Sequence, residues 1–125
     1  MCRWPFAILV LAAFSDAALA QAPRLAALFS DHMVLQREKS VPVWGWAEPG
    51  TDLTVSFAGQ SVSAKSDQSG SWKASLAPLS ASAAPQELTV KAGATVVATV
   101  RDVLVGEVWL GSGQSNMAMT VNRCA

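Results

Sequence analysis

The residues best suited to chemistry in this chain lie in a short polar stretch near its end. An apolar run from Val103 to Leu110 breaks into Gly-Ser-Gly-Gln-Ser-Asn, residues 111–116. The glycines allow a sharp turn and let a ligand approach the backbone closely. Ser115 then falls where a strand gives way to a helix, so its hydroxyl is exposed and backbone N–H groups at the helix start face a developing oxyanion. This arrangement is typical of a serine nucleophile for acyl transfer.

The same stretch also fits a plain connector. Serine and asparagine are favoured helix N-caps, and Gly-Ser-Gly is an ordinary flexible linker. A serine nucleophile also needs a base, and the chain has one histidine, His32. Its neighbour Asp31 projects to the opposite side of an extended chain, which suits an orienting hydrogen bond badly. We therefore expect His32 on the surface or in domain packing, and Cys124, which no motif surrounds, as an incidental thiol.

The residues before this stretch predict a mainly β fold. Short runs of alternating apolar and polar residues are separated by turn residues, and no apolar stripe of helical period is long enough for a helix. Strands are expected over residues 41–47, 53–58, 61–66, 72–76, 88–92, 95–100 and 103–110, with a loop over 77–85. Short strands at this spacing are typical of a small antiparallel sandwich of immunoglobulin-like type. Whether the last run adds to the sandwich stays open.

Tryptophans are the largest apolar groups available to such a core. Alternation places Trp44 and Trp46 on one face of one strand, a position that suits stacking against a sugar ring. Packing in the core or between domains is the favoured interpretation, because large aromatic side chains carry much of the burial energy of a small domain. Trp72 and Trp109 are interpreted in the same way.

The first 20 residues are predicted to be a signal peptide. They carry one early positive charge, an apolar stretch over residues 5–14 and the small-x-small pattern Ala-Leu-Ala at 18–20. Asp16 interrupts the apolar run, so we expect no membrane span. Cleavage after Ala20 predicts an exported protein, either periplasmic or extracellular.

Charge and ligand types exclude some classes of function. Nine Lys and Arg residues balance nine Asp and Glu residues, and the basic residues are scattered singly, so nucleic-acid binding is not expected. The sequence offers no cluster of Cys and His to hold a metal, and no cofactor is predicted. The oligomeric state cannot be predicted from this pattern.

Four blocks of the sequence, in the same order, resemble the start of the bacterial sialate O-acetylesterases. They are LFSDHMVLQR at 28–37, VPVWGWA at 41–47, DVLVGEVWL at 102–110 and SGQSNM at 112–117. This family belongs to the SGNH or GDSL-like serine esterases, which remove acetyl groups from sugar hydroxyls. The resemblance implies a β-sandwich that precedes or interrupts an α/β/α catalytic domain.

The resemblance also implies roles for single residues. Ser115 corresponds to the nucleophile, and its own backbone N–H contributes to the oxyanion hole. Gln114 stands where many relatives of the wider superfamily carry Asp, and Gly111 where Cys is expected in many sialate esterases; neither gains a role in the chemistry. Such enzymes take further oxyanion donors from a Gly and an Asn well downstream, and their base from a late Asp-x-x-His, none of which precedes Ala125.

Together these observations predict three parts. Residues 1–20 are a signal peptide, residues 21–102 an immunoglobulin-like β-sandwich, and residues 103–125 the first strand and nucleophile turn of a truncated SGNH hydrolase domain. We expect the N-terminal part of an exported esterase that acts on O-acetylated sugars through Ser115, with no activity from this chain alone. The alternative is a secreted β-sandwich that binds glycans or proteins without catalysis.

Overall fold

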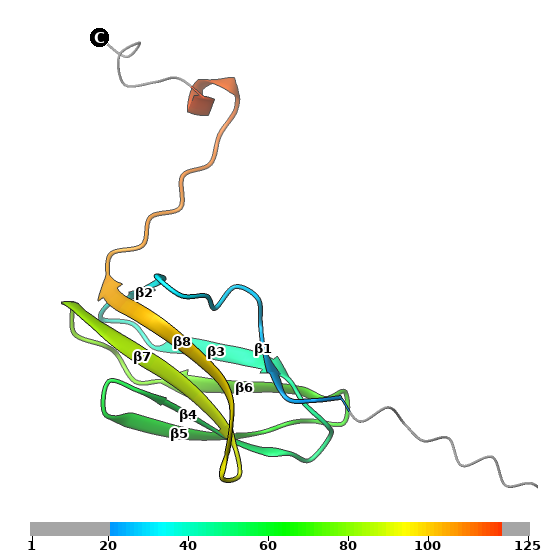
Figure 1. Cartoon of the computed structure of the whole chain (residues 1–125). Helices are drawn as coiled ribbons and strands as arrows, with labels where there is room; N and C mark the ends of the chain where they lie inside the picture. Colours follow the sequence, from blue (N-terminus) through cyan, green and yellow to red (C-terminus); the bar gives the residue numbers. More distant parts are fainter. Residues whose placement is uncertain (1–20, 119–125) are drawn as a thin grey trace, which may run out of the picture.

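Two β-sheets lie face to face in the computed structural model, which describes residues 21–118 (Figure 1). The predicted signal peptide and Cys124 lie outside these residues. The elements are β1 (Arg24–Leu25), β2 (Val34–Gln36), β3 (Val41–Trp46), β4 (Asp52–Phe57), β5 (Gln60–Lys65), β6 (Ser71–Leu76), β7 (Ser82–Ala92), β8 (Thr95–Gly106) and a 3₁₀ helix η1 (Ser115–Ala118). The prediction of a mainly β chain is confirmed. In the described part, no helix has the length and apolar character needed to cross a membrane.

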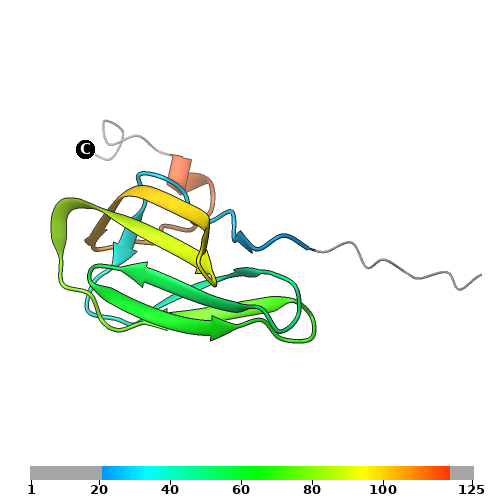
Figure 2. The same ribbon diagram turned by 60° about the horizontal axis from the view of Figure 1, so that its bottom comes forward.

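The strand order places one short and one long sheet against each other. The first sheet has the order β1-β3-β6, and the second has the order β2-β8-β7-β4-β5. All neighbours are antiparallel except β2 and β8, which run parallel. In Figure 2 the β7–β8 pair, yellow to orange, is seen to curve along the molecule.

The core lies between the sheets and follows the alternation in the sequence. Val41 and Val43 on β3 are buried, whereas Pro42 between them is exposed. The same period buries every second residue of β4 and β6, because successive side chains of a strand point to opposite faces. The largest fully buried side chains are Leu53, Val55 and Phe57 of β4, Val43, Leu76, Leu88, Val90 and Val103. Both sheets therefore contribute to one apolar layer.

The predicted loop over residues 77–85 is wrong in its second half, because β7 already begins at Ser82. Ser82 pairs with Val105 and Gln86 pairs with Val103, with shifts in register between them. Pro85 falls within this irregular stretch, where a missing backbone N–H disturbs the ladder least. The two prolines and the small residues of this stretch indicated irregular backbone, but they gave no indication of the strand that begins there.

The two strands predicted at 95–100 and 103–110 are one continuous strand, β8, that ends at Gly106. Asp102 has a positive φ of 53°, and the buried residues Val100 and Val103 on either side are three positions apart, so the alternation slips by one residue there. A bulge of this kind bends a strand without ending it. Residues 103–106 thus join the second sheet, and the predicted strand is wrong from Glu107 onward.

Gly45 marks the tightest backbone approach in the first sheet. A Cβ atom at this position would lie 2.1 Å from the carbonyl oxygen of Arg24 and 2.8 Å from the indole ring of Trp72. Both neighbours are fixed, the first by the β1–β3 pairing and the second by burial in the core. Only glycine fits between β1 and the Trp72 ring.

We predict that Gly45→Ala lowers the free energy of unfolding by about 3 kcal/mol, because a methyl group there forces β1 or Trp72 to move. Urea unfolding followed by tryptophan fluorescence measures the loss. Gly59→Ala is the matched control: its φ is +76° and no atom lies within 4 Å of the added methyl group. That control costs about 1 kcal/mol for backbone strain alone. Equal losses in the two variants would contradict tight packing at Gly45.

Candidate active site

Ser115 lies at the start of η1, at the end of an extended segment that leaves β8. Figure 1 shows this segment, in orange, running away from both sheets. We predicted that Ser115 lies where a strand passes directly into a helix. Instead, residues 107–114 separate β8 from η1, and we name them the exit segment. Ser115 is exposed, and the N–H of Met117 donates a hydrogen bond to the carbonyl oxygen of Gln114 at 3.0 Å, which closes the turn. The structure therefore presents the serine on an accessible turn.

The glycines of this turn make room for a side chain of the turn itself. A Cβ atom at Gly113 would lie 2.7 Å from Cγ of Met117, and one at Gly111 would lie 3.1 Å from its Cε. Met117 therefore folds back over the two glycines. Packing of Met117 against the turn therefore explains the Gly-x-Gly pattern, in addition to any close approach of a ligand.

His32 is paired with a carboxylate that the sequence did not point to. Its Nδ1 lies 2.5 Å from Oδ2 of Asp102. The hydrogen bond to Asp102, followed by the charge of that carboxylate, raises the pKa of His32 above 6.5. As expected from the sequence, Asp31 is not the partner of His32. Its Oδ1 instead accepts a hydrogen bond from the N–H of Arg101 at 2.7 Å.

The His32–Asp102 pair and Ser115 are not joined by the structure. Among residues 21–118 no hydrogen bond connects the imidazole with the serine hydroxyl. The His32 side chain is 78% exposed and lies on the sheet, at the start of the segment that pairs with β8. It stays on the surface, in keeping with the sequence-based expectation. Across the same residues, no group of three or more His, Cys, Asp or Glu side chains is placed to hold a metal ion.

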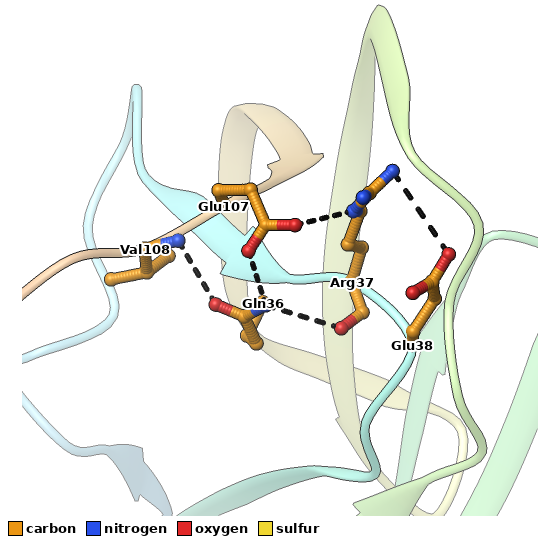
Figure 3. Close-up of polar contacts among 5 residues, drawn as sticks. All are labelled: Gln36, Arg37, Glu38, Glu107 and Val108. Atoms are coloured by element: carbon orange, nitrogen blue, oxygen red, sulfur yellow. Dashed lines mark hydrogen bonds and ion pairs between the residues drawn. The ribbon is translucent and has the colours of Figure 1, made fainter.

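Three side chains fix the point where the chain leaves β8, and we name Gln36, Arg37 and Glu107 the exit clamp (Figure 3). Arg37 Nε donates to Oε1 of Glu107 at 2.6 Å, and Gln36 Nε2 donates to Oε2 at 3.1 Å. Gln36 also accepts the N–H of Val108 through its Oε1 at 2.9 Å. Both carboxylate oxygens and the first backbone donor after the clamp are therefore occupied.

The backbone of the same region completes the attachment. The N–H of Arg37 donates to the carbonyl oxygen of Gly106 at 2.9 Å, continuing the parallel ladder in which Gln36 faces Gly106. Hydrogen bonds from Gln36 and then Arg37 hold the pKa of Glu107 below its ordinary value of 4.5. The sequence pattern did not indicate this cluster, since its members are about 70 positions apart in the chain.

Directly after the exit clamp, residues 108–110 of the exit segment are apolar and exposed. Trp109 is 87% exposed and Leu110 94% exposed. Packing of Trp109 in the core, one of the interpretations offered for it, is thus wrong in this chain, whereas Trp72 is buried as expected.

Curated relatives identify the family. Over 109 residues, which is 80% of the chain, it is 37% identical to the sialate O-acetylesterase of Mus musculus. Over 126 aligned positions, covering 91% of the chain, it is 35% identical to the sialate O-acetylesterase of Homo sapiens. The chain belongs to the sialate O-acetylesterase family. No family model matches it.

A solved structure of an acetylesterase has the same fold in the matched part. It is the crystal structure of a novel carbohydrate acetylesterase from Xanthomonas citri, which is 44% identical with a TM-score of 0.71 and covers 77% of this chain. The match takes in 22% of that enzyme. Likewise, this family member spans 20% of the mouse relative and 24% of the human one.

We predict that His32, the single histidine of the chain, titrates above pH 6.5. The proton on the imidazole is stabilised by Asp102, so Asp102→Asn brings the pKa back toward 6.5, whereas Asp31→Asn changes it little. The imidazole Cε1–H signal in NMR spectra recorded against pH measures both. A wild-type pKa at or below 6.5 would contradict the pairing.

We predict that Glu107→Gln removes part of the acid dependence of stability. Because the folded pKa of Glu107 is depressed, its ionised form stabilises the native state above pH 4.5, and this contribution is lost as the pH falls through the lower folded pKa. The variant therefore loses less of its free energy of unfolding than the wild type does over this acidic range. Urea unfolding at several pH values measures the difference, and Glu87→Gln, on the exposed side of β7, is the matched control. Identical pH profiles for wild type and Glu107→Gln would refute the clamp.

Proposed function

We propose that this chain is the N-terminal part of an exported carbohydrate O-acetylesterase of the SGNH type, with Ser115 as its nucleophile. The main support is the 44% identity and common fold with a carbohydrate acetylesterase, together with an exposed serine on the SGQSNM turn. The names of the curated relatives support an O-acetylated sugar, of sialate type, as the substrate. The N-terminal pattern of residues 1–20 supports export.

The proposed division of labour follows the chain. The two sheets act as an immunoglobulin-like accessory sandwich, and the hydrolase part starts with the exit segment and the turn that carries Ser115. The predicted boundary between residues 102 and 103 lies inside β8, so the natural place for the transition is after Gly106, at the exit clamp. The exposed side chains of Val108, Trp109 and Leu110 suit burial against the sheet of a hydrolase domain.

The proposed reaction is acyl transfer in two steps. Ser115 Oγ attacks the acetyl carbonyl carbon and gives its proton to a base, and the backbone N–H of Ser115 stabilises the oxyanion. The bond between the acetyl carbon and the sugar oxygen breaks, and the base returns the proton to the leaving hydroxyl. Water then cleaves the acetyl-serine ester to acetate and regenerates the serine. His32 is not assigned as the base, since no hydrogen bond among residues 21–118 joins its imidazole to the Ser115 hydroxyl.

We predict that Ser115→Ala lowers hydrolysis of an acetylated sugar about 10⁴-fold in a protein of the relatives' full length that carries this chain. Release of acetate from O-acetylated sialic acid measures the rate, and circular dichroism checks the fold. Ser112→Ala, three positions upstream on the exposed exit segment, is the matched control and keeps its activity. The 125-residue chain alone is expected to release no acetate. Full activity of Ser115→Ala would place the nucleophile elsewhere.

A further inference from the structure

A hollow on the described surface lies over the first sheet, at residues far along the chain from the Ser115 turn. It has a volume of about 590 Å³ and borders β3, β6 and the end of β5. Pro42, Trp44 and Trp46 project into this region from the outer face of β3, opposite to the buried Val41 and Val43. We call this site the aromatic hollow. Its lining is completed by Gly45, Lys65, Asp67, Ser71, Trp72 and Lys73.

The two outward tryptophans are held in place from outside the hollow. The Trp44 ring meets the Phe29 ring edge to face, with centroids 4.9 Å apart and planes at 77°. The guanidinium of Arg24 lies 4.6 Å from the centroid of the Trp46 ring. Neither Phe29 nor Arg24 lines the hollow, so these contacts fix the rings while leaving other ring surface to it. Because the rings are already fixed, a ligand that stacks on them pays little entropy for ordering their side chains.

The polar groups around the rings are partly unused. Asp67 is held by one oxygen: Oδ1 accepts from the N–H and the hydroxyl of Ser69 and from the N–H of Ser71, at 2.8, 2.6 and 3.0 Å. Hydrogen bonds from Ser69 and then Ser71 lower the pKa of Asp67 from its ordinary value. Its Oδ2 has no hydrogen-bond partner among residues 21–118. Lys73 takes part in no ion pair within the same range. The hollow thus offers one fixed acceptor and one free cation beside two rings.

We propose that the aromatic hollow binds a pyranose ring of a glycan, apart from the ester that Ser115 would cleave. The apolar C–H face of a pyranose suits stacking on Trp44 and Trp46, since an aromatic ring carries a negative face. Its hydroxyls suit the Asp67 Oδ2 acceptor and the Lys73 donor, which lie on the same rim. Lys73 also suits the carboxylate of an acidic sugar, whereas Lys65 already lies 3.6 Å from Asp52 Oδ1. The site needs no nucleophile, so it stands or falls independently of the proposed esterase activity.

The test uses the isotope-labelled 125-residue chain, titrated with lactose and with 3′-sialyllactose in an NMR experiment that resolves the indole N–H signals. We expect saturable shifts of the Trp44 and Trp46 signals, with a Kd of roughly 1 mM for the better sugar. The Trp109 signal, which comes from the exit segment, stays in place. Tighter binding of sialyllactose than of lactose would show that Lys73 selects an acidic sugar, and equal binding would leave a site for neutral pyranoses.

Substitutions separate binding at the hollow from sugar binding elsewhere on the chain. Trp46→Ala weakens binding about tenfold or more, because stacking on its ring is lost. Trp109→Ala, the same chemical change on the exposed exit segment, leaves it unchanged. If Trp46→Ala unfolds the chain, Lys73→Gln serves instead, because this exposed strand residue loses only its charge, and roughly a threefold weakening is expected.

Three results would overturn the proposal. The first is the absence of saturable indole shifts at roughly ten times the expected Kd for both sugars. The second is an affinity that neither Trp46→Ala nor Lys73→Gln changes. The third is a dimer in light scattering that Trp46→Ala converts to a monomer, which would make the hollow a contact between copies of this chain.

Discussion

The parallel contact between residues 31–37 and the end of β8 governs how this chain presents its candidate nucleophile. Three polar attachments along the last part of β8 arise from it: Asp31 with Arg101, His32 with Asp102, and the exit clamp around Glu107. Without β2 beside it, β8 would be an edge strand with open hydrogen-bonding groups in this region. The segment that leads to Ser115 would then leave the sheet in no defined direction.

This contact is held by several linked interactions, not by a single ion pair. An exposed ion pair by itself contributes little to stability, since water and salt screen it. Glu107 is exposed, yet it accepts from two side chains, while the backbone ladder between Gln36 and Gly106 holds the same two segments together. Such a network sets geometry more than it raises stability. The network therefore fixes the direction in which the exit segment leaves the sheet. A nucleophile depends on its scaffold for such a defined orientation.

The two sheets carry different features of the molecule. The five-stranded sheet carries the exit clamp, and the three-stranded sheet carries the aromatic hollow on its outer side. Their shared core holds the two features in one rigid unit, because side chains from both sheets interlock there.

Local pattern explains which features were foreseeable. The alternation in β3, β4 and β6 is strong, so burial of Val43, Val55 and Leu76 could be predicted residue by residue. The start of β7 and the continuity of β8 could not, because Pro85 and the positive φ of Asp102 break the alternation at bulges that only the partner strand reveals. Ser115 was recognisable as a nucleophile candidate from its neighbours, but nothing in those neighbours indicated Gln36, Arg37 or Glu107.

The sequence by itself determined the β character of the chain, the inner face of most strands and the position of the serine turn, since these depend on periods of two and on residues next to one another. The tertiary structure alone decided that His32 faces Asp102, that Arg37 holds Glu107 and that Trp44 and Trp46 border a hollow with Asp67. These partners are brought together by strand order and register. Strand pairing across long loops leaves no local periodic trace, because the contacts form between segments whose own patterns are satisfied by several alternative neighbours.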